Sequence, residues 1–480
     1  MSPILGEYSP AALGIDVASL KGITQDSRAV KDGYLFAALK GTASNGADFI
    51  PSAVENGASI ILTDQDIDPG AAQGVTVIKT DSPRKVLSYV ASEFYDGQPS
   101  KITAVTGTNG KSSVVHFIDQ LWKALELNAT YIGTLSGNMT TPDPVSLHKL
   151  LKGMYDDGIE NVAMEASSHG LDQCRMDGVH ISVAAFTSFS QDHLDYHADM
   201  TEYMAAKVRL FSEILPVNGT AVLNADSIAY DELSSVCKRR GIRTISYGEK
   251  SDDIRLVSRD IHANGQTIDV QIFGEDYKCD LPLVGAFQAK NILCALACVL
   301  AEYPDQLQIL LDALPTIEAV PGRLQYVSYG ARHAYVDYAH TPDALENVLQ
   351  ALRPHAQNRL ICVFGCGGDR DKTKRPLMGG VVSRLSDVAI VTDDNPRNED
   401  PEAIRHEIIG GMTGDGAEIM NISGRRNAIR AGVDMLEQGD ILLVAGKGHE
   451  QGQIFKDSVE PFDDVRETTS AMLGDKIKTS

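Results

Sequence analysis

With 480 residues, the chain is too long for one hydrophobic core, and about three domains are expected. Its 43% hydrophobic and 6% aromatic content suits a soluble α/β protein, and the absence of any apolar run of about 18 residues predicts no membrane-spanning helix. The formal charge of −22 argues against a nucleic-acid partner, which would need a broad basic face.

The cellular compartment is predicted from the N-terminal segment and the cysteines. The N-terminal segment lacks a basic stretch followed by an apolar core, which predicts no secretory signal. The seven cysteines are scattered without a C-x-x-C pair, and Cys294 and Cys298 lie one helical turn apart in an Ala/Leu-rich segment typical of a core. We therefore expect a cytoplasmic protein with reduced thiols.

Residues 1–98 alternate short apolar runs with helical stretches, which predicts a small α/β domain. The expected strands cover residues 34–39, 59–63 and 75–78, and the expected helices cover residues 52–57 and 83–94. The turn at Gly97-Gln98-Pro99 predicts a domain boundary.

Residues 99–318 contain recurring apolar strands with helical segments between them, a pattern that predicts a doubly wound parallel sheet. The expected strands cover residues 102–105, 162–164, 184–186, 220–223 and 243–246, and residues 254–283 form a β-rich excursion. The Val320–Arg323 turn marks the start of a third domain, residues 319–480, with strands expected at 334–336, 360–364, 387–391 and 441–444. The predicted fold class is α/β with three domains.

The most informative motif is the loop between the strand at 102–105 and the helix expected at 114–125. It reads Gly107-Thr108-Asn109-Gly110-Lys111-Ser112-Ser113. Small residues before a helix N-terminus turn backbone N–H groups toward a phosphate, while Lys111 reaches the outer phosphates and Ser112 can ligate Mg²⁺. The usual phosphate-loop pattern has a glycine at position 105, where this chain has valine, so an ordinary strand–turn–helix connection is the alternative.

Two further motifs of the central region carry metal-binding side chains. Glu165 ends a buried strand, where phosphate-loop enzymes place an acid that holds Mg²⁺; a helix N-terminal acid is the alternative. The segment Gln191–His197 contains His193 among two histidines and two aspartates, which favours a metal or phosphate site. By its pattern alone, Lys207 is an exposed helix lysine.

Four charged, Gly/Pro-rich loops follow successive strands of the third domain. They are Asp337–Pro342, Gly365–Lys372, Asp393–Arg397 and Ala445–Glu450. Because ligands bind at the carboxyl ends of the strands in open α/β sheets, we expect these loops to face one site.

Taken in order, these motifs resemble those of the Mur ligases, and the resemblance covers essentially the whole chain. It also rests on Asp26-Ser27-Arg28, Gly33-Tyr34-Leu35-Phe36, the segment Gly285–Asn291 and Pro321-Gly322-Arg323. The family fold implies a UDP-sugar-binding domain (1–98), a central phosphate-loop ATPase domain (99–318) and a Rossmann-like amino-acid-binding domain (319–480).

The resemblance also implies roles for individual residues. Ser27 and the Gly41–Gly46 loop would contact the UDP group, and the muramoyl-peptide would be held by Thr140, Thr141, Ser167, Gln173 and Arg175. Nucleotide and Mg²⁺ would be held by residues 107–113, Glu165, His193, Asn291, Arg323 and Asp337. At the position of Lys207 the family lysine carries CO₂ as a carbamate, whose anionic oxygen suits Mg²⁺ better than an ammonium does.

The segment Asp394-Asn395-Pro396-Arg397 resembles the recognition motif of the family members that add meso-diaminopimelate. An arginine binds the second carboxylate of this amino acid in a bidentate way, and lysine-adding relatives lack that arginine. Arg370, Gly446 and Glu450 match the remaining positions for this substrate.

The expected activity is thus an ATP-dependent ligase, with Mg²⁺ as cofactor, that joins meso-diaminopimelate to UDP-N-acetylmuramoyl-L-alanyl-D-glutamate. The alternatives are a lysine-adding Mur ligase, a folylpolyglutamate synthase-like ligase and a GTPase switch, whose N-K-x-D guanine signature the chain lacks. We expect a monomer.

Overall fold

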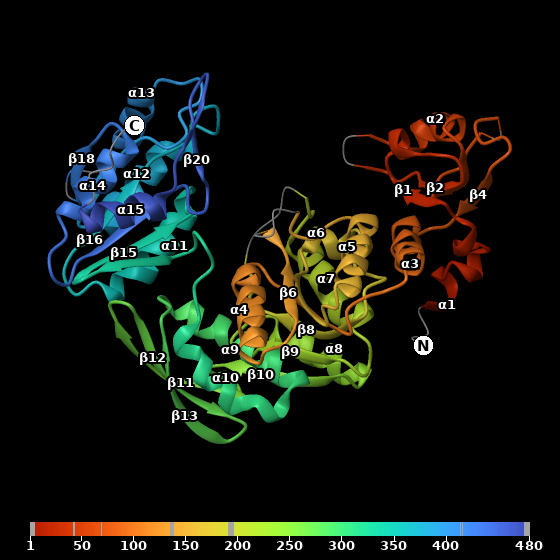
Figure 1. Cartoon of the computed structure of the whole chain (residues 1–480), viewed down its shortest axis with the longest axis horizontal. Helices are drawn as coiled ribbons and strands as arrows, with labels where there is room; N and C mark the ends of the chain where they lie inside the picture. Colours follow the sequence, from red (N-terminus) through yellow and green to blue (C-terminus); the bar gives the residue numbers. More distant parts are fainter. Residues whose placement is uncertain are drawn as a thin grey trace. The chain divides into compact units, whose positions relative to one another are not determined.

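The computed structural model describes residues 5–41, 44–68, 70–134, 139–190, 196–412, 414 and 416–474. The chain, whose helices and strands are labelled in Figure 1, forms two compact units. The first comprises Met1–Arg255, Gln271–Glu275 and Lys290–Leu311, and the second comprises Leu256–Val270, Asp276–Ala289 and Asp312–Ser480.

The first unit begins with a four-stranded parallel sheet in the order β1-β2-β3-β4. Its elements are α1 (Leu5–Tyr8), β1 (Gly22–Thr24), β2 (Tyr34–Ala37), α2 (Ile50–Glu55), β3 (Ala58–Thr63), β4 (Thr76–Lys79) and α3 (Pro83–Tyr95). Gln98 connects this part to the next, because its amide donates to the Gly178 carbonyl and accepts from the His180 N–H.

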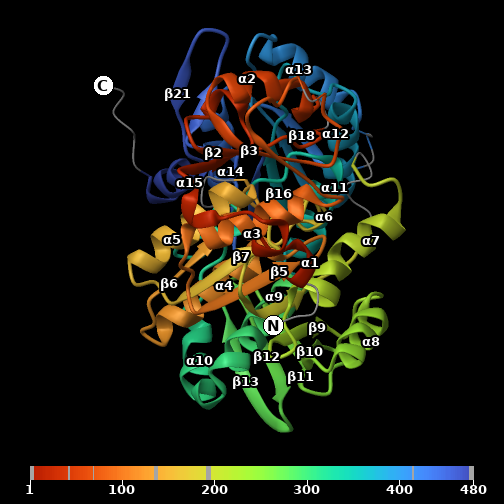
Figure 2. The same ribbon diagram turned by 90° about the vertical axis from the view of Figure 1, so that its right-hand side faces the viewer.

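The first unit continues with parallel strands in the order β10-β9-β8-β5-β7-β6. The elements are β5 (Lys101–Thr106), α4 (Lys111–Ala124), β6 (Ala129–Ile132), α5 (Pro144–Asp156), β7 (Asn161–Glu165), α6 (Ser168–Asp172), β8 (Ile181–Phe186), α7 (Met200–Arg209), β9 (Thr220–Asn224), α8 (Tyr230–Arg240) and β10 (Arg243–Gly248). Helix α4 packs on β5, β6 and β7, and α8 packs on β9 and β10 (Figure 2). Because β5 lies between β7 and β8, the loop after β5 leaves the sheet between the ends of two neighbouring strands.

Three longer strands follow in the chain: β11 (Ile254–His262), β12 (Gly265–Ile272) and β13 (Glu275–Leu281). They form the β-rich excursion expected from the sequence, and their residues are divided between the two units. Helix α9 (Ala286–Glu302) is divided in the same way, and α10 (Leu307–Ala313) follows. Cys294 and Cys298 are fully buried in α9, as their apolar surroundings predict.

The main sheet of the second unit has the order β14-β15-β19-β16-β17-β18, with only the β14–β15 pair antiparallel. Its elements are β14 (Gln325–Tyr329), β15 (Arg332–Asp337), α11 (Pro342–Leu352), β16 (Leu360–Phe364), α12 (Lys374–Leu385), β17 (Val388–Val391), α13 (Pro401–Ile409), β18 (Glu418–Asn421), α14 (Arg425–Asp434), β19 (Ile441–Ala445) and α15 (Asp464–Leu473). A hairpin of β20 (Gly452–Ile454) and β21 (Val459–Pro461) precedes α15.

This sheet is buried on both faces, which explains why its central strands are continuous apolar runs. Leu360, Cys362 and Phe364 of β16 pack in the core beneath α11, α12 and α13. Ile361 and Val363, which point the other way, pack in the core beneath α14 and α15. The helices on both faces leave the strand ends as the place for loops with polar side chains.

Some residues of the β-rich excursion belong to the second unit and form hydrogen bonds with the main sheet and helices of that unit. Tyr335 donates its hydroxyl to the Ala263 carbonyl at 2.7 Å. His355 bonds the His262 carbonyl through Nδ1 and accepts from the Gly285 N–H through Nε2. The excursion is therefore part of the packing of this unit.

Many helices begin at a side chain that accepts hydrogen bonds from the first turn. Asp143, Thr341 and Asp400 cap α5, α11 and α13, and each is followed by a proline at the first helical position. This combination satisfies the unpaired N–H groups and presets the backbone for a helix.

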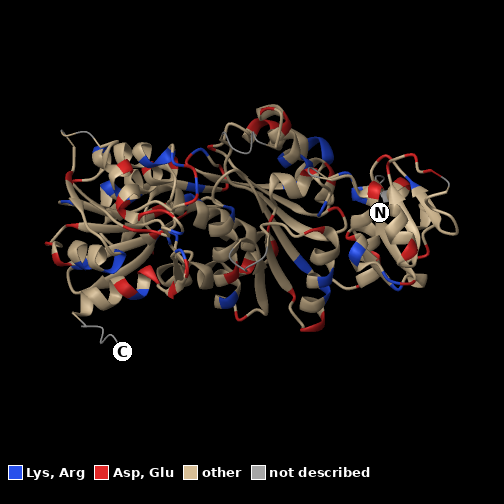
Figure 3. Ribbon diagram, turned by 90° about the horizontal axis from the view of Figure 1, so that it is seen from above, with Lys and Arg blue, Asp and Glu red and all other residues tan. Residues whose placement is uncertain are grey.

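Acidic and basic residues are interspersed along the ribbon of each unit (Figure 3). Within the described part of the chain, no helix combines the length and apolarity that a bilayer crossing requires.

Candidate active site

The loop after β5 is held in its shape by two glycines with positive φ. Gly107 has φ +143°, and a Cβ placed there would lie 2.0 Å from Thr187 Oγ1. Gly110 has φ +89°, and its Cβ would lie 2.6 Å from Asn291 Oδ1. Only glycine fits either position, so the backbone comes close to its neighbours and α4 begins at Lys111 with its N-terminus facing the loop.

Two lysines donate to the same carbonyl of this loop. Lys111 Nζ lies 2.9 Å from the Gly107 oxygen and 2.8 Å from the Thr108 oxygen. Lys207 Nζ, from α7, lies 2.8 Å from the Gly107 oxygen and 4.4 Å from the centre of the Tyr203 ring. Lys207 is only 1% exposed, so the expectation of an exposed helix lysine from the pattern alone is wrong.

Glu165 ends β7 beside the loop and is 1% exposed. Its Oε1 accepts from Ser112 Oγ at 3.0 Å and from the Thr134 N–H at 2.9 Å. A hydroxyl and a carboxylate this close are the hard oxygen ligands that Mg²⁺ prefers, so these two residues fit the expected metal. His193 lies outside the described residues, and within the described part no group of three or more His, Cys, Asp or Glu side chains is arranged to hold a metal.

The residues after β8 support the loop, a role that the sequence analysis missed. Ser188 accepts from the Thr108 N–H through its carbonyl and from the Asn109 N–H through its hydroxyl, at 2.8 and 3.0 Å. Thr187 Oγ1 donates to the Asn109 carbonyl at 2.5 Å. Ser113 lies in the first turn of α4, half-buried.

Four of the five residues expected to hold the muramoyl-peptide form one hydrogen-bonded group near the end of β7, and the fifth, Thr140, bonds Thr134. Arg175 donates to the Thr141 carbonyl at 2.6 Å and to Gln173 Oε1 at 2.8 Å. Ser167 Oγ lies 3.0 Å from Thr141 Oγ1, and Thr140 lies 3.0 Å from Thr134 through their hydroxyls. Burial lowers the pKa of Arg175, which nonetheless stays a cation at neutral pH.

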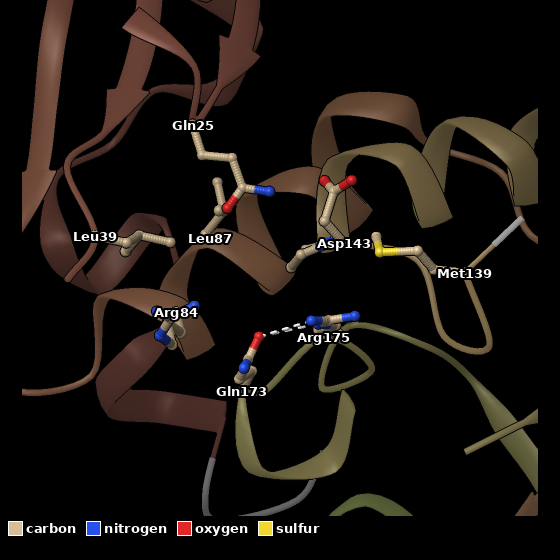
Figure 4. A pocket seen from close by; sticks show the side chains of 9 residues that line it. Gln25, Leu39, Arg84, Leu87, Met139, Asp143, Gln173 and Arg175 are labelled. Atoms are coloured by element: carbon tan, nitrogen blue, oxygen red, sulfur yellow. Dashed lines mark hydrogen bonds between the residues drawn. The ribbon is translucent and has the colours of Figure 1, made fainter. Parts of the chain in front are cut away.

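A cavity of about 230 Å³ opens beside this group (Figure 4). Its lining combines Gln173 and Arg175 with residues from the N-terminal part, and it consists of Gln25, Leu39, Arg84, Leu87, Met139, Asp143, Pro144, Gln173 and Arg175. Ser27 is buried two residues beyond Gln25, and its carbonyl accepts from Asn56. In the Gly41–Gly46 loop, of which residues 42 and 43 lie outside the described part, Gly41 donates to the Ser44 carbonyl.

In the second unit, Asp337 ends β15 and is 4% exposed. Its two oxygens accept from the N–H groups of Leu324 and Ala339 at 2.8 and 2.7 Å. Burial raises its pKa above the ordinary value although these hydrogen bonds act in the opposite direction. Arg323 is exposed and stacks over the Tyr338 ring.

The segment Asp394–Arg397 follows β17 and is organised around Asn395, which is 3% exposed. The Asn395 amide donates to Glu450 and accepts from Lys447 and from the Ile454 N–H, all within 3.0 Å. Arg397 has φ +52° and donates through Nη1 to the Gly368 carbonyl at 2.8 Å. A Cβ on Gly368 would lie 1.9 Å from the Pro396 carbonyl, so the loops after β16 and β17 pack backbone to backbone.

Glu450 lies at the end of the loop after β19, where Lys447 donates to its Oε2 at 2.9 Å. Burial raises the pKa of Glu450, but the hydrogen bonds from Lys447 and Asn395 outweigh burial and lower it. Glu450 is therefore a carboxylate suited to an ammonium group. Gly446 has φ +122°, and its Cβ would lie 2.8 Å from Asp394 Oδ2.

The structure thus brings together residues that follow β17 and β19, the two strands on either side of β16: Asp394, Asn395, Pro396, Arg397, Gly446 and Glu450. Arg370 lies on the adjacent loop, exposed. Three further residues near these loops were not predicted from the sequence, because their contacts join segments that no local motif connects: Gln453, Arg425 and Asp464.

Comparison with known sequences decides the family. Sequence profiles of the family match residues 19–95 (Mur ligase family, catalytic domain), 105–299 (Mur ligase middle domain) and 322–448 (Mur ligase, glutamate ligase domain). The chain belongs to the Mur ligase family. The resemblance stated from its motifs and the predicted α/β three-domain class are confirmed.

Several relatives that match nearly the whole chain carry one name. The chain is 46% identical, over 95% of its length and 96% of the relative, to the UDP-N-acetylmuramoyl-L-alanyl-D-glutamate–2,6-diaminopimelate ligase of Caulobacter vibrioides. It is 43% identical to the enzyme of that name from Brucella melitensis, over 98% and 97% of the two chains. A solved structure of that name superposes with a TM-score of 0.76 at 33% identity and covers 95% of each chain.

Proposed function

We propose that this Mur ligase family member joins meso-2,6-diaminopimelate to UDP-N-acetylmuramoyl-L-alanyl-D-glutamate at the expense of ATP. The similarity over nearly the whole length to ligases of that name carries the proposal. The arrangement of Asn395, Arg397 and Glu450 supports it, because a dicarboxylic diamino acid needs both cationic and anionic partners.

We assign activation of the D-glutamyl γ-carboxylate to the first unit. The carboxylate attacks the γ-phosphorus of ATP to form an acyl-phosphate with release of ADP, and the loop N–H groups and Lys111 stabilise the developing charge. Mg²⁺, held by Ser112, Glu165 and His193, would supply charge neutralisation at the phosphates. The amino group then attacks the acyl-phosphate, and the tetrahedral intermediate releases phosphate to leave the amide.

We further propose that Lys207 carries a carbamate in the active enzyme. Its side chain is buried at the phosphate loop together with Lys111, where a second cation would repel Mg²⁺ and a carbamate would bind it. A carbamate signal after equilibration with ¹³C-bicarbonate, present in the native protein and absent in Lys207→Ala, is the expected ¹³C NMR result. No difference between the two spectra would exclude the modification.

The remaining assignments follow the family positions. The UDP group is assigned to Ser27 and the Gly41–Gly46 loop, and the muramoyl-peptide to the group of Thr140, Thr141, Ser167, Gln173 and Arg175 beside the cavity. Asn291, Arg323 and Asp337 are assigned to the nucleotide. We also propose three domains, with the bounds 1–98, 99–318 and 319–480. The protein is proposed to be a monomer in the cytoplasm, where ATP and UDP-linked precursors occur.

A ligation assay tests the function directly. Purified protein is incubated with the UDP-dipeptide, ATP and one amino acid from a panel, with phosphate release and product mass as readouts. We expect product with meso-diaminopimelate and little with L-lysine. Preference for lysine would establish the alternative Mur ligase activity, and phosphate release that needs no amino acid would indicate a nucleotide switch.

Arg397 provides the test of substrate choice. Arg397→Ala should raise the apparent KM for meso-diaminopimelate at least tenfold, because a bidentate carboxylate contact is lost, while the KM for ATP changes little. Steady-state kinetics with each substrate varied in turn measure both values. Unchanged discrimination between diaminopimelate and lysine would remove Arg397 from the substrate site.

A further inference from the structure

A fully buried ion pair lies beneath the proposed amino-acid site. Arg425 begins α14, and Asp464 begins α15, 39 positions later in the chain. Arg425 Nε and Nη2 donate to the two oxygens of Asp464 at 2.7 and 2.6 Å, and both side chains are 0% exposed. Removing both charges from water costs free energy, so burial of this pair is not by itself evidence that the pair stabilises the fold.

The remaining contacts of Arg425 lead to the site. Its Nη2 also donates to the Ala445 carbonyl at 2.9 Å, the residue before Gly446. Its Nη1 is buried and has no hydrogen-bond partner among the described residues. An unpartnered buried guanidinium nitrogen is rare, because the lost hydration is not replaced.

The unpartnered nitrogen lies near Gly446, a glycine that Asp394 also approaches. A Cβ on Gly446 would be 3.8 Å from Arg425 Nη1 and 2.8 Å from Asp394 Oδ2, so both groups border the space that this glycine leaves open. Asp394 Oδ1 accepts from the Asn395 N–H at 2.7 Å, which orients the carboxylate. Burial disfavours the charged form of Arg425, whereas the carboxylates of Asp464, Asp394 and Glu450 favour that form. The net effect raises the pKa of Arg425.

A neighbouring ion pair also joins α14 to α15 and provides a comparison for Arg425 and Asp464. Arg426 Nε and Nη2 donate to the two oxygens of Glu467 at 2.8 Å, and this pair joins the same two helices. Arg426 also lies over the ring of Phe462, and its side chain is 41% exposed. The two helices are thus joined without Arg425, whose additional hydrogen bond reaches Ala445 at the end of β19.

We propose that Arg425 is a positioning residue for the amino-acid substrate: it fixes the Ala445–Gly446 turn and balances the charge of Asp394, and so sets the affinity for meso-diaminopimelate. This inference rests on the proposed function. Asp394 is then the partner of a substrate ammonium, and Arg425 supplies a positive charge near that carboxylate.

Arg425→Lys in the full-length enzyme tests the proposal, with Arg426→Lys as the matched control. Lysine keeps the charge of Arg425 but cannot hold Asp464 and Ala445 together. We expect the KM for meso-diaminopimelate to rise at least tenfold while the KM values for ATP and the UDP-dipeptide stay within twofold. Arg426→Lys should leave all three within twofold. Equal effects of the two substitutions, or a uniform loss of kcat, would overturn the proposal.

Asp464→Asn is the second variant, because it loosens the anchor of Arg425 and keeps the guanidinium. A selective rise of about threefold in the KM for meso-diaminopimelate is expected. Loss of folding in both variants, seen by thermal unfolding, would assign the pair to stability alone and overturn the inference. A wild-type enzyme that does not use meso-diaminopimelate would instead refute the proposed function itself.

Discussion

The carbonyl of Gly107 accepts hydrogen bonds from two lysines that are 96 positions apart in the chain. This is possible because Gly107 has no Cβ, so the backbone lies against Thr187 and Ser188. The orientation of the loop therefore depends on a glycine at position 107.

Gly107→Ala tests this dependence. A Cβ would overlap Thr187 Oγ1 and also strain the backbone, so the loop must shift, and a shift of about 1 Å at a reacting centre costs roughly 100-fold in rate. We expect kcat/KM for ATP to fall by about that factor. Gly153→Ala is the control, because Gly153 lies exposed in α5 with nothing within 4 Å, and it should stabilise the protein by about 0.5–1 kcal/mol. Equal kinetics for both variants would contradict the argument.

His148 makes the stability of the first unit depend on pH. Burial lowers its pKa to about 3, and its Nε2 has no hydrogen-bond partner in the described part of the chain. The unfolded chain, with a histidine pKa of about 6.5, binds the proton more readily. This contribution to stability is complete above pH about 6.5 and is lost as pH falls toward 3, by about 2 kcal/mol at pH 5.

Urea unfolding at pH 7.5 and pH 5 measures this effect. Trp122, the one tryptophan of the chain, is buried in α4 of the same unit, so its fluorescence reports the relevant transition. His148→Leu should reduce the difference in unfolding free energy between the two pH values. His180→Gln, at an exposed neighbour, should retain most of it. The idea fails if His148→Leu and the wild type lose the same stability between the two pH values.

Local motifs predict only those site residues whose partners are near in sequence or at the next strand end. Lys111 and Glu165 were predicted as site residues because loop and strand-end patterns indicate their surroundings, and the structure brings both to the phosphate loop, although their roles stay predictions. Arg425 has an ordinary helix pattern, and its partner Asp464 lies on another helix, so nothing local indicates a buried pair. Lys207 shows the same limit, because only the resemblance to a family suggested that it is not exposed.

At the scale of elements, the β20–β21 hairpin contacts the segment that is proposed to choose the substrate. Gln453 donates to the Asp394 carbonyl at 2.6 Å, and the Arg397 N–H donates to the Ile454 carbonyl at 3.1 Å. The hairpin thus forms hydrogen bonds with the backbone of the Asp394–Arg397 segment and holds this segment in place.

Gln453→Ala should therefore weaken amino-acid binding. Loss of a buried hydrogen bond of about 1 kcal/mol corresponds to a rise of about fivefold in the KM for meso-diaminopimelate, with the KM for ATP unchanged. Lys456→Ala, at the exposed tip of the hairpin, is the control and should change neither value. A parallel change in both KM values would show that the hairpin has no selective role.

The central strands were predicted well, whereas several edge elements were missed. Strands β5, β7, β16 and β19 are apolar runs buried on both faces, which is a strong signal. Strands β6 and β18 lie at sheet edges and include partly or largely exposed polar residues, so their sequences resemble loops. The pairing that makes them strands comes from the neighbouring strand and not from their own composition.

At the scale of the molecule, all seven cysteines are free and six of them are buried. Cys174 is the exception, and burial raises its pKa to about 11, so little thiolate exists at pH 8. Titration with a disulfide reagent at pH 8 should modify fewer than one thiol rapidly in the native protein and all seven in guanidinium. Rapid modification of several native thiols would show that the core opens easily.

The path of the chain constrains how this enzyme can be recombined with its relatives. The backbone crosses between the two units after Arg255, Val270, Glu275, Ala289 and Leu311, so neither unit is one continuous cassette. A chimera that takes only residues 319–480 from a lysine-adding donor would separate Tyr335 and His355 from Ala263 and His262. A chimera with a new amino-acid preference therefore requires that β11, β12 and β13 come from the same donor as the loops that are proposed to bind the amino acid.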